Sequence, residues 1–454
     1  MRIAFLTLGC KVNYFETEKM IADFRKNGYS IVDFEEEAEV YVVNTCTVTN
    51  IADRKSRQML HRARKKAPHA LIVAVGCYVE SAGASIAEEK AVDIAYGNRE
   101  KTRLAELVGE ELEKRFRSRQ KLKEDETKTT QTPPSDTHHR RTRAFLKVQD
   151  GCNQFCSYCL IPYVRGRGEL TSTPPEEVER EVRRRVEEGC REIVLTGIHL
   201  SSYGVSPESA APGSESGARV RADAFIREEG KPLLELIRRV NAISGVERIR
   251  LGSLEPRIIT EGWLEGLKTV EKLCPHFHLS LQSGCDETLA RMNRHYTTED
   301  FFERTELLRK VFDRPALTTD LIVGFPGETE EEFAETLEFL EKVGFADLHI
   351  FQYSMRDGTR AAAMGDQISP EEKKRRSEEL LSRVSGWRSD YIRQQEKEEQ
   401  RILFEETILR DGVRYLTGYN ERYVRYGVEE GVAAARRYVP GECFSVPSRD
   451  RSIF

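Results

Sequence analysis

Short apolar runs alternate with helix-like segments along the first hundred residues of the chain. The runs RIAFLTL, VYVVNT and LIVAVG have the pattern of buried strands, DIAYG has that of a shorter fourth strand, and helical spacing fills the intervals. Strands that alternate with helices predict a parallel sheet with helices on both faces. We therefore expect an N-terminal α/β domain over residues 1–111.

A second alternating series begins near residue 142 and continues to residue 370. Six or so strand–helix units in about 230 residues favour a (βα) barrel or partial barrel over a flat doubly wound sheet. Within it, residues 205–230 are rich in Ser, Ala, Gly and Pro, which predicts an inserted loop. Residues 112–141 carry many charges, Thr and Pro, and are predicted to leave the first domain as a partial helix and to continue as a linker.

The end of the chain has a different pattern. Residues 371–398 predict a charged connecting helix, and residues 399–454 contain short β segments that are typical of a small all-β module. A chain of 454 residues is longer than one hydrophobic core normally supports, which agrees with several domains.

Composition limits the compartment and the chemistry. No apolar run reaches the length of a membrane span, and the opening residues MRIAFLTLGC lack the sections of a signal peptide. We expect a cytoplasmic protein that does not contact a membrane. In that reducing compartment, ten cysteines favour metal binding or catalysis over disulfides.

Three of the ten cysteines lie within eight residues, at the end of the first strand of the predicted barrel. Cys152, Cys156 and Cys159 have the spacing C-x3-C-x2-C, and the next cysteine is Cys190, beyond a predicted helix. A tetrahedral zinc site would want a fourth ligand nearby. A [4Fe–4S] cube normally takes four thiolates, so three of them leave one iron open to another ligand. The spacing therefore predicts an iron–sulfur cube with an open iron.

This loop resembles the cluster loop of the radical S-adenosylmethionine (SAM) superfamily, including an aromatic residue, Tyr158, just before the last cysteine. The resemblance implies that SAM chelates the open iron. It also implies that an electron from the cluster splits SAM into methionine and a 5′-deoxyadenosyl radical. Residues at the ends of later strands would then meet SAM or the substrate, namely Gly197, Glu255, Ser280 and Gly324. Ordinary turn chemistry at a strand end is the alternative for each of these.

Three further cysteines each follow an apolar strand of the N-terminal domain: Cys10, Cys46 and Cys77. The carboxyl ends of parallel strands share one edge of the sheet, so these thiols should converge there. Three convergent thiols predict a second cube with an open iron. Three buried core cysteines are the alternative, but that does not explain why each falls just past a strand. The other four cysteines share no motif spacing and are expected to be buried or incidental: Cys190, Cys274, Cys285 and Cys443.

With two such cysteine sets, the chain resembles the radical SAM methylthiotransferases through LGCKVN, NTCTV, VGCYV and CNQFCSYC. The resemblance implies two [4Fe–4S] clusters, with SAM as methyl donor and radical source. It also implies a sulfur donor and an external electron donor of the flavodoxin or ferredoxin type. The C-terminal part of this family is a small RNA-binding β-barrel called TRAM, which residues 399–454 match more weakly. The spacing of the residues indicates no protein general base.

Three substrates compete within that family: isopentenyl-adenosine in tRNA, an aspartate of a ribosomal protein, and threonylcarbamoyl-adenosine (t6A) in tRNA. LGCKVN, NTCTVTNIADRKSRQ, GSLEP and GYNERYV resemble the third branch. The resemblance thus implies methylthiolation of t6A at C2, beside the anticodon, giving 2-methylthio-t6A.

A basic segment supports an RNA partner. The net charge of −5 does not by itself indicate a nucleic-acid binder, but residues 54–66 hold seven basic residues and no acid. This predicted helix begins just after Cys46, so a phosphate backbone bound there would pass close to the second cluster. We expect tRNA contacts from Arg62, Arg64, Lys65 and Lys66, and a solvated helix face is the alternative.

Two functions of other kinds stay open. One is a radical SAM enzyme whose second cluster only transfers electrons. The other is a non-catalytic RNA-binding protein with a structural metal, which the basic segment and the β-rich tail would also suit.

Overall fold

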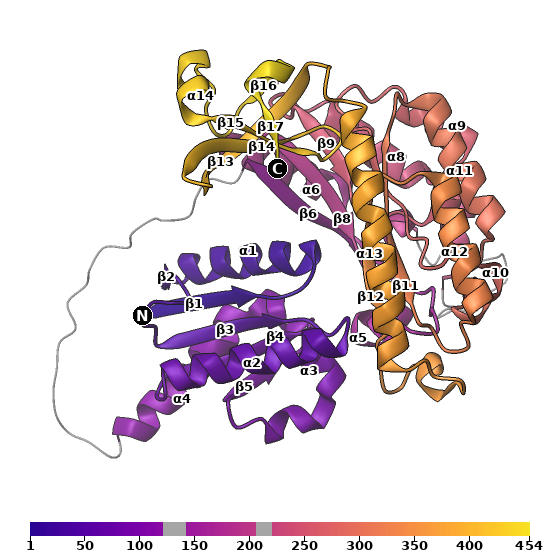
Figure 1. Cartoon of the computed structure of the whole chain (residues 1–454). Coiled ribbons are helices and arrows are strands. Elements are labelled where there is room, and N and C mark those ends of the chain that lie inside the picture. The colour runs from indigo at the N-terminus through magenta and orange to yellow at the C-terminus, as the bar shows by residue number, and fades with distance from the viewer. Residues whose placement is uncertain (121–141, 206–219) are drawn as a thin grey trace. The chain divides into compact units, whose positions relative to one another are not determined.

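The computed structural model of the chain describes residues 1–120, 142–205 and 220–454 (Figure 1). It forms two compact units. The first comprises Met1–His138 with Tyr163–Arg165, and the second comprises His139–Pro162 with Gly166–Phe454. No helix within the described ranges is long and apolar enough to cross a membrane.

The first unit is built on one parallel sheet with the strand order β2-β1-β3-β4-β5. Its strands are β1 (Arg2–Thr7), β2 (Ser30–Val32), β3 (Val40–Thr45), β4 (Leu71–Gly76) and β5 (Ile94–Tyr96). Its helices are α1 (Lys11–Lys26), α2 (Asn50–Lys66), α3 (Cys77–Ala82) and α4 (Leu104–Gln120).

Both faces of this sheet are buried, which explains why β3 and β4 are apolar at nearly every position. Successive side chains of a strand point to opposite faces. Val42 and Val73 pack with α1 and α4 on one face, and Tyr41 and Ile72 pack with α2 on the other. Figure 1 shows α1 and α2 on opposite sides of the sheet. The predicted N-terminal α/β fold is confirmed.

The second unit contains six parallel strands in two sheets. They are β6 (Arg143–Asp150), β8 (Glu192–Gly197), β9 (Arg248–Leu251), β10 (His276–His278), β11 (Ala316–Val323) and β12 (Asp347–Gln352). A parallel bridge between Leu254 and Leu279 joins the β9 and β10 segments, so the strands follow one another as in a partial barrel. A short strand, β7 (Thr171–Ser172), pairs antiparallel with β6. The predicted partial barrel is confirmed.

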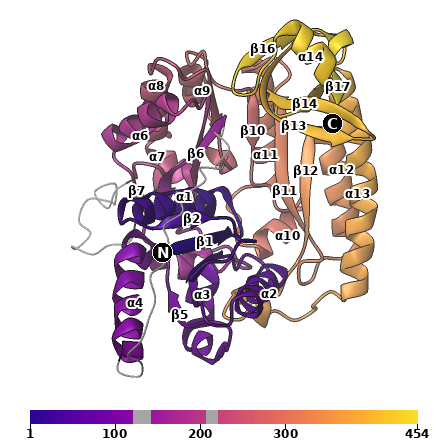
Figure 2. The ribbon, with the colours of Figure 1, turned by 90° about the vertical axis from the view of Figure 1, so that its left-hand side faces the viewer.

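Helices connect these strands and lie beside them, as Figure 2 shows for α11 and α12 next to β11 and β12. The helices of this part are α5 (Ile161–Val164), α6 (Pro175–Glu187), α7 (Ala224–Arg227), α8 (Lys231–Asn241), α9 (Glu261–Leu267), α10 (Asp286–Arg291), α11 (Thr298–Val311) and α12 (Glu330–Val343). α11 and α12 begin at capping boxes, formed by Thr297 with Asp300 and by Thr329 with Glu332, which fix where each helix starts.

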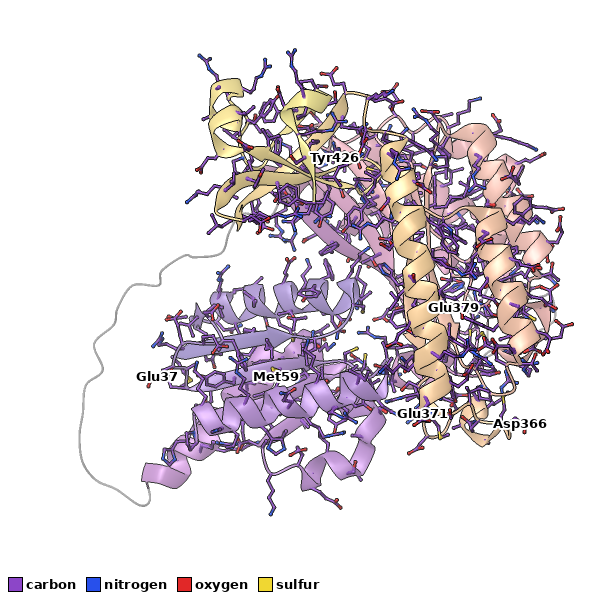
Figure 3. All side chains as sticks on the ribbon, viewed as in Figure 1. Glu37, Met59, Asp366, Glu371, Glu379 and Tyr426 are labelled. Carbon is purple, nitrogen blue, oxygen red and sulfur yellow. The ribbon has the colours of Figure 1, made fainter. Side chains whose placement is uncertain are left out.

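The chain ends in a long helix and an antiparallel sheet. Helix α13 (Pro370–Arg393) packs on β12. The sheet has the order β16-β13-β14-β15-β17 and forms a half-barrel. Its elements are β13 (Gln400–Arg410), β14 (Val413–Asn420), β15 (Arg425–Glu429), α14 (Glu430–Arg436), β16 (Cys443–Val446) and β17 (Ser452–Ile453). Its core contains the buried side chains of Phe404 and Tyr426, the latter labelled in Figure 3. This architecture agrees with the TRAM-like module that was expected.

Buried charges join this C-terminal sheet to the first residues of the barrel strands. Arg248 donates to the carbonyl oxygens of Tyr419 (2.8 Å) and Arg401 (2.6 Å). Arg250 forms two hydrogen bonds with Glu192, at 2.8 and 3.2 Å, and its guanidinium lies 4.6 Å from the centre of the Tyr423 ring. The side chains of Arg248, Arg250 and Glu192 are at most 1% exposed.

The predicted linker and inserted loop are described only in part. α4 continues to Gln120, so the beginning of the 112–141 linker is helical, as the expected partial exit helix requires. Residues 121–141 and 206–219, which contain the rest of the linker and most of the 205–230 loop, lie outside the described residues. The domain boundaries stay predictions.

Candidate metal centres

The first cysteine set lies at the carboxyl edge of the N-terminal sheet. Cys10 precedes α1, Cys46 directly follows β3, and Cys77 is the first residue of α3 after β4. Because β1, β3 and β4 are neighbours, the three strand ends are adjacent. Cys10 is exposed, whereas Cys46 and Cys77 are buried. The structure therefore brings this set to one place, as the parallel topology predicts.

Two glycines let the backbone approach these thiols. Gly9 has a φ of +102°, and a Cβ there would lie 2.9 Å from the Sγ atom of Cys46. Gly76, also at +102°, leaves room for the Asn44 side chain, whose Oδ1 would lie 2.8 Å from an added Cβ. Any larger residue would be strained in this conformation and would collide with the site.

Cys77 rests on a buried network of charged groups. Arg165 Nε donates to Cys77 Sγ (3.3 Å), and the same guanidinium donates to Glu16 Oε1 (2.9 Å) and Asn13 Oδ1 (2.9 Å). Lys101 Nζ lies 2.6 Å from Glu16 Oε2. The side chain of Arg165 is 1% exposed and that of Lys101 is 4% exposed. Two buried cations thus face one carboxylate, and a thiolate at Cys77 would balance the remaining positive charge.

The Cys46 thiol lies close enough to Cys10 and Cys77 for them to affect its pKa. Burial, together with the nearby Cys77 and Cys10, raises the pKa of Cys46 to about 11, although a backbone hydrogen bond from Val48 lowers it in part. Burial and Arg165 lower the pKa of Lys101 more than Glu16 and Cys77 raise it, so the pKa is below its ordinary value. Cys46 therefore becomes a thiolate at neutral pH only when a cation replaces its proton, as a metal ligand does.

The second cysteine set lies in the loop between β6 and α5. A hydrogen bond from the Cys159 amide to the Cys156 carbonyl (3.0 Å) turns this loop. Asn293 donates to the carbonyl oxygens of Gln154 (3.3 Å) and Phe155 (3.2 Å). All three cysteines are half-buried, and burial raises the pKa of Cys152 to about 12.

Arg294 connects this loop to the end of β10. Its Nη1 donates to Cys156 Sγ (3.3 Å) and its Nη2 to the carbonyl oxygen of Ser280 (3.0 Å). The guanidinium also lies 4.9 Å from the centre of the Tyr296 ring. Sequence reasoning missed both Arg294 and Arg165, since neither falls in a recognised spacing with its cysteine.

The donor sets fit a multi-iron cube better than a single ion. Among the described residues, ligand atoms of three His, Cys, Asp or Glu side chains lie within 4.8 Å of one another at two places, and neither includes these six cysteines. A single tetrahedral ion with metal–sulfur bonds of about 2.3 Å holds its sulfurs only about 3.8 Å apart. Three thiols around a cube spread more widely.

The other residues predicted to bind the cofactor gather around the second cysteine set. Tyr158 packs edge-on against Phe325, with ring centres 6.4 Å apart. Gly197 ends β8, and the Gln149 side chain beside it donates to the carbonyls of Asp150 and Gly151 in the cysteine loop. Gly324 directly follows β11, and its amide donates to Glu328 Oε2 (2.6 Å).

Glu255 is at the expected edge but is engaged within the protein. Its Oε1 accepts from Arg257 Nε (2.7 Å), and its Oε2 accepts from the Arg257 amide (3.0 Å). Arg257 also reaches Gln154 Oε1 in the cysteine loop (3.4 Å). Glu255 therefore supports the loop through Arg257, and cofactor binding by its carboxylate stays a prediction.

The predicted basic helix exists as α2, but most of the residues selected for tRNA contact have protein partners. Arg62 forms an ion pair with Glu35 (2.6 Å), and Lys66 also contacts Glu35. Arg64 donates to the carbonyl oxygens of Pro68 and Ala70 and pairs with Asp93. Lys65 is exposed.

The four remaining cysteines lie apart from both sets. Cys190, Cys274 and Cys285 are buried and Cys443 is half-buried. Burial raises the pKa of Cys274 to about 12, which makes it an inert thiol at neutral pH.

Family models match two parts of the chain. The model described as Radical SAM superfamily matches residues 146–340, and the model described as Uncharacterized protein family UPF0004 matches residues 2–97. The first match contains the cysteine loop, and the second contains Cys10, Cys46 and Cys77.

Curated proteins match over most of the chain. It is 39% identical over 426 residues to the threonylcarbamoyladenosine tRNA methylthiotransferase MtaB of Bacillus subtilis, covering 93% of this chain and 89% of that protein. It is 36% identical over 408 residues to the protein of the same name from Aquifex aeolicus, covering 89% and 92%. A tRNA-2-methylthio-N(6)-dimethylallyladenosine synthase of Clostridium botulinum is 33% identical over 411 residues, covering 89% and 86%.

Solved structures share the fold at low sequence identity. The radical S-adenosylmethionine methyltransferase TsrM of Kitasatospora setae, with cobalamin and a [4Fe–4S] cluster bound, matches with a TM-score of 0.51 and 14% identity. The match covers 77% of this chain and 74% of TsrM. At this identity the likeness concerns the fold alone.

Proposed function

The chain belongs to the radical SAM methylthiotransferases, and from this premise we propose that it methylthiolates C2 of N6-threonylcarbamoyladenosine beside the anticodon of a tRNA. The product would be 2-methylthio-t6A. The observation that carries the choice of substrate is the 39% and 36% identity, across about nine-tenths of the chain, to two proteins named for that nucleoside.

Each of the two compact units would hold one iron–sulfur cluster. Cys152, Cys156 and Cys159 would hold one [4Fe–4S] cluster, and Cys10, Cys46 and Cys77 would hold the other. When bound, these clusters together with SAM supply the radical that activates the carbon and the sulfur and methyl group that are transferred.

The side chains of the protein orient and shield these groups. Arg294 links Cys156 to the segment that follows β10, and Tyr158 packs on Phe325 beside the cysteine loop. Arg165 and Lys101 place positive charge beneath Cys77, which favours an anionic group there. We assign SAM contacts to Tyr158, Gly197, Glu255, Ser280 and Gly324.

The partners follow from the reaction. We propose that tRNA is the macromolecular substrate and that the enzyme acts in the cytoplasm. An external electron donor of the flavodoxin or ferredoxin type and a separate sulfur donor would serve the clusters. The C-terminal half-barrel and α2 would contact the RNA. Of the residues selected on that helix, Arg62 and Lys65 are exposed, and Arg62 pairs with Glu35.

We also propose domain boundaries. The methylthiotransferase domain would span residues 1–111, the linker 112–141, the radical SAM domain 142–370, the connecting helix 371–398 and the RNA-binding module 399–454. The start of α13 at Pro370 and of β13 at Gln400 supports the last two boundaries.

The test is nucleoside analysis by mass spectrometry of tRNA from cells that lack the protein, with and without plasmid-borne copies. We expect 2-methylthio-t6A to disappear, t6A to accumulate, and the wild-type copy to restore the product. A Cys77→Ala copy should fail and a Cys443→Ala copy should succeed.

A second candidate substrate is the adenosine that carries a dimethylallyl group, because relatives at 33% identity are named for it. If 2-methylthio-t6A persists in the deleted strain and the dimethylallyl analogue vanishes, that candidate replaces the first.

A further inference from the structure

Three polar side chains meet on neighbouring strands of the barrel, outside both cysteine sets. One nitrogen or carboxylate oxygen from each of His278, Asp320 and His349 lies within 4.8 Å of the others. His278 Nε2 is 3.3 Å from Asp320 Oδ2, and the two imidazole rings have centres 5.8 Å apart. The residues come from β10, β11 and β12, and Asp320 is paired with His349 in the register. These three residues are here named the His–Asp cluster.

The His–Asp cluster faces the interior of the barrel. Along β11, Thr319, Leu321 and Val323 are buried, whereas Asp320 and Ile322 on the other face are half-buried. Helices cover the outside of a (βα) barrel, so the fully buried residues face the helices and the half-buried ones face the interior.

The same interior face leads to the radical SAM loop. Ile322, two residues after Asp320, packs in one hydrophobic cluster with Tyr158 and Phe325. The carbonyl oxygen of Ser280, two residues after His278, accepts a hydrogen bond from Arg294, and the same guanidinium donates to Cys156 Sγ. The His–Asp cluster thus lies about one layer of side chains deeper than the residues assigned to SAM.

The His–Asp cluster has an ordered member and an exposed member. His278 Nδ1 lies 3.0 Å from Thr318 Oγ1, which directs its Nε2 toward Asp320. His349 is exposed, and Phe351, on the same face of β12, is 42% exposed. An imidazole and a carboxylate beside an apolar ring are suited to a ligand with polar groups at one end and a flat base at the other.

We infer that the His–Asp cluster selects the substrate by binding the N6 substituent of the adenosine, with His349 on its carboxylate and Asp320 on its N–H or O–H donors. The inference rests on the proposed function. A threonylcarbamoyl group carries a carboxylate, a hydroxyl and amide N–H groups, whereas a dimethylallyl group carries only carbon and hydrogen. An apolar substituent would remove water from the His–Asp cluster without replacing its hydrogen bonds, and a site of that kind rejects such an analogue strongly.

The experiment uses the full chain, reconstituted anaerobically, and three anticodon stem-loop RNAs that differ at one adenosine. They carry threonylcarbamoyl, its carboxylate methyl ester, or dimethylallyl. Product formation is followed by mass spectrometry, and the variants are His349→Ala, His349→Gln and Asp320→Asn. His69→Ala, an exposed histidine of the other unit, is the matched control.

We expect the wild type and His69→Ala to prefer the free acid over the ester. His349→Ala should lower kcat/KM for the acid by about 10- to 100-fold, leave the ester unchanged, and so abolish the preference. His349→Gln should keep part of the rate because it still donates a hydrogen bond. Asp320→Asn should lower kcat/KM for the acid and the ester alike. Iron content and uncoupled cleavage of SAM should stay at the wild-type level in every variant, which distinguishes a lost contact from a lost fold.

Three results would overturn the inference. One is an equal effect of His349→Ala on acid and ester, including no effect on either. Another is a stoichiometric divalent ion that the wild type binds in addition to iron and that His349→Ala loses, since the His–Asp cluster would then be a metal site. The third is a wild type that modifies only the dimethylallyl RNA, and this result alone also refutes the proposed function.

Discussion

At the scale of single residues, both candidate metal centres consist of three cysteines and one arginine that donates a hydrogen bond to a cysteine sulfur. Cys77 and Cys156 each accept a hydrogen bond at 3.3 Å from a guanidinium, which is buried at Cys77 and half-buried at Cys156. Arg165 serves the first and Arg294 the second. In both places a positive charge lies against the sulfur that is expected to bind iron, so the protein prepares each site for an anionic group.

The cysteine sets predict a simple iron count. Wild-type protein reconstituted without air should carry about eight irons, and the triple change of Cys10, Cys46 and Cys77 to alanine should leave about four. That variant should still cleave SAM to 5′-deoxyadenosine but form no methylthio product. Iron assay and chromatography of the nucleoside products measure both outcomes, and Cys443→Ala is the control. Eight irons in the triple variant would contradict the assignment of this set.

Arg165 predicts a shift in reduction potential. Arg165→Gln removes a buried positive charge and a hydrogen bond to Cys77, so the reduced cluster loses stabilisation and its potential should fall by roughly 60 mV. A potentiometric titration followed by electron paramagnetic resonance measures it. Arg165→Lys should recover part of the loss, and Arg167→Gln, an exposed neighbour, should change nothing. An unchanged reduction potential in Arg165→Gln would show that Arg165 does not tune the cluster at Cys77.

At the scale of elements, the parallel topology explains why strand-end cysteines could be predicted to converge. Once β1, β3 and β4 are neighbours in a parallel sheet, residues just past their ends must share an edge. The same reasoning places Gly197 and Gly324 at the carboxyl edge of the barrel. This reasoning could not find Arg165, because Tyr163–Arg165 packs with the first unit although the chain on either side of it belongs to the second. The assignment of so short a segment to the other unit depends on tertiary packing, which leaves no periodic pattern in the sequence.

Helix α2 shows where a charge pattern misleads. A run of basic residues predicts a nucleic-acid surface, yet Arg64 donates to two carbonyl oxygens of the loop that follows its helix and pairs with Asp93. Partner carboxylates such as Glu35 and Asp93 are distant in sequence, so a local reading cannot assign them. The helix itself was predictable, and the use of its side chains was not.

Lys65 is exposed, whereas Arg64 has partners within the protein, so glutamate at these adjacent positions should have different effects. Lys65→Glu should weaken tRNA binding severalfold at moderate salt and leave the melting temperature unchanged. Arg64→Glu should lower the melting temperature, because it breaks the contacts with Asp93 and with two carbonyls of the loop after α2. Filter binding and thermal unfolding separate the two, with Lys90→Glu as an exposed control in the same unit. Equal affinity of Lys65→Glu and wild type would exclude α2 from the RNA surface.

At the scale of the whole second unit, the C-terminal sheet and the barrel share a buried charged layer. Glu192 lies between Arg250 and Arg248, and Arg143 pairs with Glu405. Burial raises the pKa of Glu192, but Arg250, Arg143 and Arg248 together lower it more, so the net pKa is below its usual range. None of these pairs was predictable from the sequence, since Glu192 meets arginines of a neighbouring strand and Arg143 meets a glutamate of a module far along the chain.

Glu192→Gln should destabilise this unit by about 3 kcal/mol, because it leaves buried arginines without their counter-ion. A carboxylate with a lowered folded pKa stabilises the fold above the unfolded value of about 4.3, and this contribution is lost as the pH falls through the folded pKa. The variant should therefore lose less stability than wild type on acidification from pH 6 to pH 3. Denaturant unfolding at both pH values measures the difference. An identical pH dependence in the two proteins would show that Glu192 does not supply it.

The buried charged layer lies at the amino ends of the barrel strands. Arg143, Glu192, Arg248 and His276 all belong to the first residues of barrel strands, and the side chain of Tyr423 lies among them. The C-terminal sheet therefore covers the amino ends of these strands. We expect the substrate to enter and leave the partial barrel on its other sides, where the carboxyl ends of the strands and the cysteine loop lie.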